Sequence, residues 1–223
     1  MTSLKKHWRT WVLIGILTDC SVLFAARRIF AAPDVTLSGA VSLADLDGSP
    51  RDSDGAVNGI FTVGGNLTLA RGARITCGAQ SPSGGPCSVR LAVGGNLEMR
   101  PASRIFSGRD AGAGGGIEIA VGGDFTMRGS RGLAPGALIR AADGDAASGG
   151  AIEIFAVGKV VTEPGSAIVS DAAADGGEIS ITAAATEIHG GLSARATAAG
   201  GRPGPIALAS TRDAVPGQER RRS

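Results

Sequence analysis

The chain has 223 residues and a formal net charge of +2, and 36 of its residues are glycine. Its aromatic residues are six phenylalanines and two tryptophans with no tyrosine, which is less bulk than a conventional globular core uses. The glycines follow no three-residue period, so the composition excludes collagen. Basic residues form no face or stripe along the body of the chain, which excludes a typical nucleic-acid-binding protein.

Residues 1–32 have the pattern of an export signal. Lys5, Lys6 and Arg9 precede the apolar run Trp11–Ala26, which is shorter than the about 20 residues that a membrane span prefers. We predict a signal helix that is cleaved after Ala32, with an uncleaved signal anchor as the alternative. The sequence therefore predicts an exported protein, located in the periplasm, at the cell surface or outside the cell. Any contact with the membrane is expected through this segment alone.

Residues 33–56 do not match the repeat that follows, and we expect them to form an N-terminal cap. They contain an acidic cluster made of Asp45, Asp47, Asp52 and Asp54. Paired Asp-x-Asp-Gly sequences begin some calcium loops, but Pro50 and Ala56 stand where such a loop has glycine and glutamate. We interpret the cluster as Asp-rich turns and keep calcium binding as the alternative.

A phrase of the form Val-Gly-Gly-Asn/Asp recurs at a period of about 30 residues, which is typical of solenoids and repeat arrays. Its copies begin at Val63, Val93 and Val121, and a degraded copy begins at Val157. Each repeat divides into three short runs in which apolar and polar residues alternate, as they do in half-buried strands. The repeat region extends over residues 57–210.

The expected fold is all-β: a right-handed parallel β-solenoid, or β-helix, with three short strands per coil and about five and a half coils. Val63, Val93 and Val121 should form one interior column, and Ile75, Ile105 and Ile139 another. An antiparallel sandwich of short strands is the rival fold. It would not require the same turn sequence at the same place in every repeat, whereas stacked coils do.

The corner after each first strand predicts a ladder of polar side chains. Glycine supplies positive φ at such corners without steric cost, and Asn or Asp hydrogen-bonds nearby backbone. We expect Asn66, Asn96 and Asp124 to stack as a structural corner ladder; a row of cation ligands is the alternative.

Cys77 and Cys87 enclose a short loop of turn-forming residues. In an exported protein a disulfide that closes this loop is plausible, and we predict one. Two free buried thiols are the alternative. No histidine lies nearby to complete a zinc site.

Glycine-rich excursions over residues 107–116 and 141–150, and an insertion over Arg128–Ala134, interrupt the repeats. Loops on a rigid scaffold are where binding usually resides.

Ile206–Leu208 begins a coil without a second run after it, and we expect residues 211–223 to be a disordered basic tail. An exposed strand edge of this kind predicts end-to-end self-association, unless the chain is the front part of a longer array.

No catalytic set is evident, and we expect neither an enzyme nor a cofactor. His189 is the only histidine outside the export signal, so no Ser–His–Asp or Cys–His set is available. Glu118 and Glu153 occupy equivalent outward positions, at the spacing of a retaining carboxylate pair if their strands are neighbours. The alternative function is therefore a polysaccharide-active β-helix enzyme, a lyase or a glycoside hydrolase.

The run over residues 58–69, Asn-Gly-Ile-Phe-Thr-Val-Gly-Gly-Asn-Leu-Thr-Leu, and the later Gly-Gly-Asp-Phe-Thr-Met run resemble bacterial exported β-solenoid proteins of the filamentous-haemagglutinin/adhesin type. The resemblance covers roughly residues 57–208. It implies a non-enzymatic, adhesin-like structural protein at the surface or outside the cell, which displays loops to cell-surface or extracellular polymers. It carries over no functional residue, because the repeat consists of packing and corner positions.

Overall fold

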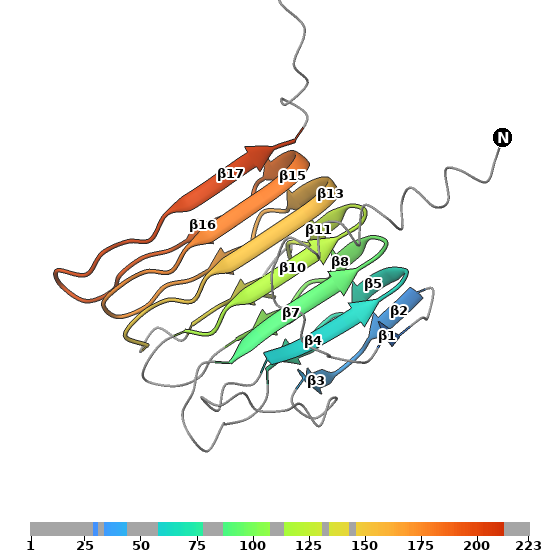
Figure 1. Ribbon diagram of the computed structural model, residues 1–223, viewed down its shortest axis with the longest axis horizontal. Helices are drawn as coiled ribbons and strands as arrows, with labels where there is room; N and C mark the ends of the chain where they lie inside the picture. Colours follow the sequence, from blue (N-terminus) through green and yellow to red (C-terminus); the bar gives the residue numbers. More distant parts are fainter. Residues whose placement is uncertain are drawn as a thin grey trace, which may run out of the picture.

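The structure, a computed structural model, describes residues 29–30, 34–43, 58–77, 87–107, 114–130, 134–142 and 146–211. Over these residues the chain is all-β, and its strands stack in parallel into a solenoid-like array (Figure 1). The parallel, all-β part of the prediction is confirmed, and an antiparallel sandwich is excluded for the described residues. No helix in this part of the chain is long and apolar enough to cross a membrane.

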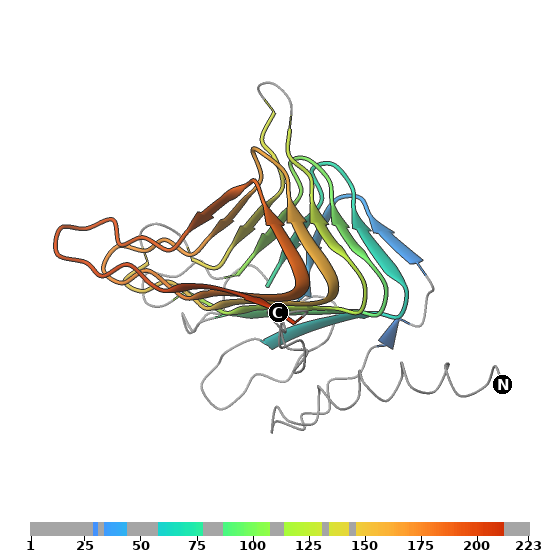
Figure 2. The same ribbon diagram turned by 90° about the horizontal axis from the view of Figure 1, so that it is seen from above.

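The coils have three sides, which Figure 2 shows along the stack. The first side contains, in stacking order, β1 (Ile29–Phe30), β4 (Asn58–Val63), β7 (Ser88–Val93), β10 (Ile117–Val121), the first half of β13 (Ile152–Thr162), the first half of β15 (Ile179–Ile188) and β17 (Ile206–Ser210).

The second side contains β2 (Asp34–Leu37), β5 (Asn66–Leu69), β8 (Leu97–Met99), β11 (Phe125–Met127) and the second halves of β13 and β15. The third side contains β3 (Ala40–Ser42), β6 (Arg74–Thr76), β9 (Arg104–Phe106), β12 (Leu138–Arg140), β14 (Ala167–Val169) and β16 (Gly191–Ser193). β13 and β15 continue around the first corner without a break, with a register shift between Ala156 and Lys159.

The core is a set of columns in which equivalent residues of successive coils lie one above another. Val63, Val93 and Val121 are partners in register and are at most 2% exposed. A second column on the third side contains Ile75, Ile105, Ile139 and Ile168, each 0% exposed. The alternation of apolar and polar residues predicts both columns, because successive side chains of a strand point to opposite faces.

The paired glycines of the first corner are needed for close approach between coils, and the expectation of positive φ there is wrong. A Cβ atom on Gly94 would lie 2.3 Å from the carbonyl oxygen of Gly64, and one on Gly122 would lie 2.3 Å from that of Gly94. Neither Gly94 nor Gly122 has positive φ. Stacked corners leave no room for a side chain, so glycine is required by the neighbouring coil.

Positive φ occurs instead at the second corner, between the second and third sides. Gly72, Ala102 and Gly165 have φ of 77°, 62° and 88°. Each lies in a turn closed by a backbone hydrogen bond across three residues, such as Ala73 N to Ala70 O at 3.0 Å. A turn of type II needs positive φ at its third residue, which favours glycine there.

Several predicted segments lie wholly or partly outside the described residues. Of residues 1–32, the structure describes only Ile29 and Phe30, so the predicted signal helix lies outside it. Of residues 33–56 it describes 34–43, where β2 pairs with β5 and β3 pairs with β6, one strand on each of two sides. The predicted basic tail is described only at Thr211.

Candidate functional surfaces

The first corner carries a continuous hydrogen-bonded ladder of side chains. The Oδ1 atom of Asn66 accepts a hydrogen bond from the backbone N–H of Asn96, and that of Asn96 accepts one from Asp124, each at 2.8 Å. Asp34 extends the ladder at one end by accepting from Asn66 at 2.9 Å, and Asp124 accepts from the N–H of Lys159 at 2.9 Å. Each side chain therefore satisfies a backbone donor of the next coil, which is a structural role.

The four aspartates considered for calcium, Asp45, Asp47, Asp52 and Asp54, lie outside the described residues. Within the part of the chain that the structure describes, no three His, Cys, Asp or Glu side chains come together as a metal site.

A shallow groove lies across the first side, where β7, β10 and β13 begin. Its volume is about 270 Å³ and its charged lining residues are Arg90, Glu118 and Glu153. These residues are partners in register on successive strands, so their side chains form one outward row. Adjacent strands of a sheet are about 4.8 Å apart, which brings the two glutamates close together.

The chemistry of this groove is that of a charged surface. The Nε atom of Arg90 lies 3.1 Å from Oε2 of Glu118, and about half of each side chain is exposed, at 47% and 46%. A general acid in glycoside hydrolysis needs a carboxyl group whose pKa is raised by its surroundings, usually through burial. Glu118 is half exposed and paired with an arginine, so it lacks the buried surroundings of such an acid.

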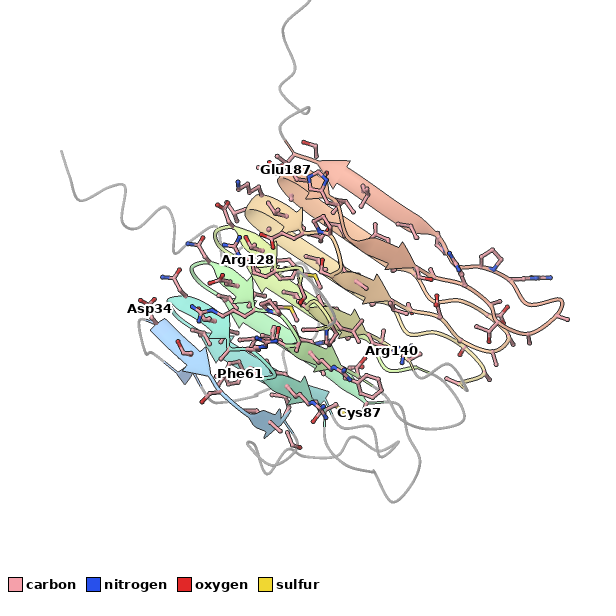
Figure 3. All side chains as sticks on the ribbon, turned by 180° about the vertical axis from the view of Figure 1, so that it is seen from behind. Asp34, Phe61, Cys87, Arg128, Arg140 and Glu187 are labelled. Carbon is pink, nitrogen blue, oxygen red and sulfur yellow. A yellow bond between two sulfur atoms is a disulfide. The ribbon has the colours of Figure 1, made fainter. Side chains whose placement is uncertain are left out.

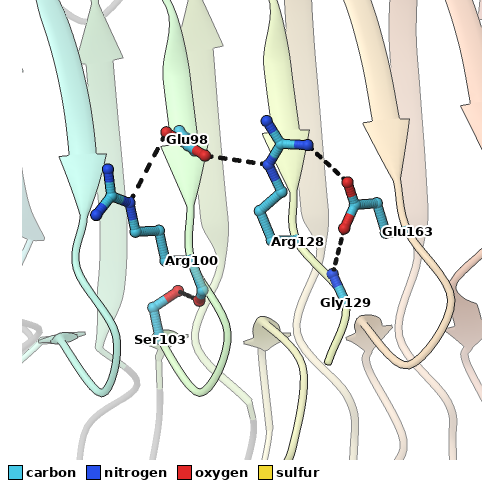
Figure 4. A network of polar contacts seen from close by, with 6 residues as sticks. All are labelled: Glu98, Arg100, Ser103, Arg128, Gly129 and Glu163. Carbon is cyan, nitrogen blue, oxygen red and sulfur yellow. Dashed lines mark hydrogen bonds and ion pairs between the residues drawn. The ribbon is translucent and has the colours of Figure 1, made fainter. Parts of the chain in front are cut away.

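A second charged group lies on the second side, where the sequence pattern does not predict one. Arg128 directly follows β11; its Nε lies 3.0 Å from Oε1 of Glu98, and one terminal nitrogen lies 2.6 Å from Oε1 of Glu163 (Figure 4). The N–H of Gly129 donates to Oε2 of Glu163 at 3.0 Å, and Arg100 lies 4.0 Å from Glu98. The charges link three successive coils at the base of the insertion that begins with Arg128.

Hydrogen bonds to Glu163 and then to Glu98 raise the pKa of the Arg128 guanidinium above its ordinary value, and partial burial opposes them. A basic group whose pKa is raised on folding stabilises the protein. This stabilisation is complete at pH values below the pKa of the unfolded state, and it is lost as the pH rises through the pKa of the folded state. Arginine remains charged well above neutral pH. Near neutral pH, the contact should therefore respond to salt more than to the titration of Arg128.

Cys77 follows β6, Cys87 precedes β7, and the two are joined by a disulfide with their Cα atoms 5.9 Å apart. The bond closes the connection between the first two coils of the repeat. A disulfide in so short a loop is a weak indication of an oxidising compartment.

The most prominent surface feature is a flat projection, here called the tongue, formed by residues 146–150, 170–178 and 194–205 (Figure 2). Successive layers pair in parallel, through the bridges Ser148 to Asp175, Ala172 to Ala196 and Asp175 to Arg202. Small residues allow this close packing: a Cβ atom on Gly176 would lie 2.1 Å from the carbonyl oxygen of Ala194. The sequence predicts an excursion at residues 141–150 but gives no sign that later excursions stack on it.

Comparison with known proteins supplies no relative. No family model matches the chain, and searches of curated proteins and of solved structures find no match.

Proposed function

We propose that this chain is an exported, non-enzymatic structural protein, adhesin-like, which displays loops on a β-solenoid at a cell surface or outside the cell. The observation that carries the proposal is the tongue, in which three excursions from successive coils project together from a rigid stack. Such a surface binds extended polymers more readily than a small molecule, because it is long, flat and repeated at the spacing of the coils. The export pattern of residues 1–32 and the disulfide support an extracytoplasmic location.

The resemblance to exported solenoids of the filamentous-haemagglutinin/adhesin type agrees with this proposal and rests on the repeat phrase alone. We also propose that the coils wind to the right, since about 98% of crossovers between parallel strands do so.

The test has two readouts on the full chain expressed with its own N-terminal segment. Mass spectrometry of the exported product should show cleavage after Ala32 or an intact signal anchor. Sedimentation with insoluble cell-wall and matrix polysaccharides should then detect binding to extracellular polymers. A protein that stays in the cytoplasm, or that binds none of the polymers, would contradict the proposal.

Variants locate the binding surface. Arg195→Ala with Arg202→Ala removes two exposed cationic side chains from the outer layer of the tongue and should weaken binding to anionic polymers severalfold. Arg74→Ala removes an exposed arginine from the third side, away from the tongue, and should leave binding unchanged.

The second candidate, a polysaccharide-active enzyme, rests on the alignment of Glu118 with Glu153 on neighbouring strands. Neighbouring strands lie about 4.8 Å apart, which is close to the separation of about 5–5.5 Å between the two carboxyl groups of a retaining enzyme. Release of reducing sugars by the wild-type protein, abolished in both Glu118→Gln and Glu153→Gln, would establish this function in place of the structural one.

A further inference from the structure

Among the described residues, a strand covers the last coil of the stack on one of its three sides. β17 pairs with the first half of β15, from Ile179 to Ala183. Among the described residues, no strand pairs with the outer edge of β16 or with that of the second half of β15. Ile206 and Leu208 occupy inward positions of β17, yet they are 44% and 50% exposed. Within the part of the chain that the structure describes, the stack therefore ends in an incomplete coil with exposed apolar side chains.

Residues 212–223, which directly follow Thr211, are poorly suited to form strands of this coil. A complete coil needs two further strands with inward apolar residues, and the described residues supply neither at this end of the stack. Residues 212–223 contain Ala214 and Val215 as their only aliphatic side chains, followed by Pro216. Proline cannot donate a hydrogen bond to a strand pair.

The other end of the stack is incomplete in the complementary way. β2 and β3 cover the second and third sides of the first repeat. Their inward residues Val35, Leu37 and Val41 pack on the core and remain only partly buried. On the first side, β1 pairs with β4 only at Thr62 and Val63. Among the described residues, this end therefore has the two sides that the opposite end lacks, and on the first side it has only the two residues of β1.

We propose that copies of this protein stack head to tail, so that β17 of one copy and β2 and β3 of the next form a single complete coil. The strands contribute five, four and three residues. Figure 3 shows Asp34 and Glu187 toward opposite ends of the stack, so the two surfaces of one copy cannot meet each other. The contact joins unlike surfaces and leaves both ends free, which generates filaments.

The registers within the stack specify which residues meet. Leu208 aligns with Phe61 of the next copy through the unbroken register of the first side. By the same reasoning, Val35 and Leu37 lie against Thr186 and Ile188 of the preceding copy.

On the third side, Val41 of one copy lies against Leu192 of the preceding copy. In this shared coil, Ser210 of one copy and Asp34 of the next meet at the first corner, where the other repeats have a short bend. The break between the two chains therefore falls at a corner. All three sheet sides then continue from one copy into the next at the ordinary spacing between strands.

β1 occupies part of the position that β17 takes in this coil. Ile29 and Phe30 pair with Thr62 and Val63, which are the partners that Ala209 and Ser210 would have. Cleavage after Ala32 removes β1 and leaves β2 intact. On this point alone the inference rests on the proposed export, and it predicts that processing promotes assembly.

The first test is complementation between two blocked variants of the exported protein, followed by sedimentation velocity over a range of concentrations. Ile206→Lys with Leu208→Lys blocks one end, and Val35→Lys with Val41→Lys blocks the other. Each variant alone should be monomeric, and an equimolar mixture should form dimers that grow no further. The outward substitutions Ala207→Lys and Thr36→Lys lie on the same strands and should leave the concentration-dependent filaments of the wild type intact. Circular dichroism checks that every variant keeps its β-structure.

The second test fixes the register. Thr62→Cys on one copy and Ala209→Cys on another should form an intermolecular disulfide, because partners in adjacent parallel strands lie within the about 4.4–6.8 Å that a disulfide spans. Thr68→Cys, on the second side, should not cross-link to Ala209→Cys. In the uncleaved protein, Phe30→Pro removes a hydrogen-bond donor of β1 and should therefore increase assembly relative to the uncleaved wild type. This comparison tests stacking even if the protein is not exported and cleaved.

A wild-type protein that stays monomeric at high concentration would overturn the proposal and show that the chain covers its own end. Dimers formed by one blocked variant alone would overturn it in favour of contacts between like ends.

Discussion

At the corners of this fold, single residues are constrained by the neighbouring coil as much as by their own backbone. The glycines of the Val-Gly-Gly corner have ordinary φ, but the backbone of the neighbouring coil leaves no space for a Cβ atom. At the second corner the reverse holds: Gly72 has open space around its missing side chain and a φ of 77°. The same residue type thus serves two physical purposes at two turns of one coil.

Gly122→Ala should destabilise the protein because its Cβ would lie 2.3 Å from the backbone oxygen of Gly94. Backbone atoms cannot move aside as a flexible side chain would, so we expect a cost of about 1–3 kcal/mol, as in other overpacked sites. Chemical denaturation measures it. Gly116→Ala is the matched control, since its nearest contact would be 3.5 Å, and its effect should stay within about 0.5 kcal/mol. Equal effects at both positions would refute the steric account.

Ala102→Gly should stabilise the protein, because Ala102 has a φ of 62° at a turn position that favours glycine. A left-handed backbone conformation costs alanine about 1–2 kcal/mol in the folded state, and glycine avoids this cost. Glycine loses more conformational entropy on folding than alanine does, which offsets part of the gain. We expect a net gain of about 0.5–1 kcal/mol in thermal or chemical unfolding. The reverse change, Gly72→Ala, should cost a similar amount, and a loss of stability in Ala102→Gly would contradict the assignment.

At the scale of elements, charged contacts fasten a variable insertion to a regular stack. Arg128 bridges Glu98 of the preceding coil and Glu163 of the next, and Glu163 also accepts the N–H of Gly129. The side chains are about one third to one half exposed, so each pair contributes little to global stability, about 0–1 kcal/mol. Their effect should be mainly local.

Glu163→Gln should loosen the start of the insertion, because it removes the charge that Arg128 and the Gly129 N–H share. We expect hydrogen exchange of the Gly129 amide to accelerate by up to about fivefold, which corresponds to about 1 kcal/mol. Glu118→Gln removes the ion-pair partner of Arg90 on the first side and serves as the control. If both variants, or neither, change exchange at Gly129, the local role of Glu163 is refuted.

Much of the element pattern could be predicted from the sequence, because equivalent corners of stacked coils demand similar residues. The phrases at Val63, Val93 and Val121 therefore mark the register directly. The sequence before β2 does not show this phrase, because it has Ala31, Ala32 and Pro33 where the other repeats have Gly-Gly. Asp34 nevertheless pairs with Asn66 and accepts a hydrogen bond from it, as the corresponding residues of the ladder do.

The charged and projecting surfaces could not be predicted in the same way. The contact of Arg128 with Glu163 depends on how two coils align across an insertion that has no counterpart in the other repeats. The tongue depends on backbone pairing between alanine- and glycine-rich segments, and such segments carry no alternating pattern. Its stacking follows from the coils below it, which bring the segments together.

At the scale of the whole molecule, each coil lies directly on the previous one, with equivalent residues in register. Shared columns of small aliphatic residues then supply a continuous core, and the chain needs few aromatic residues. The same repetition leaves each end of the stack open unless something covers it, which connects the fold to the proposed assembly.

The most direct test is the distance between spin labels on Thr68 and Glu187, measured by pulsed electron resonance in protein diluted with unlabelled chain. Thr68, Glu98, Thr126, Val161 and Glu187 are successive partners in register on the second side. We expect about four strand spacings, or about 19 Å between the backbones, with one narrow distribution. A broad distribution, or one centred well away from that value, would contradict the stacking of the coils.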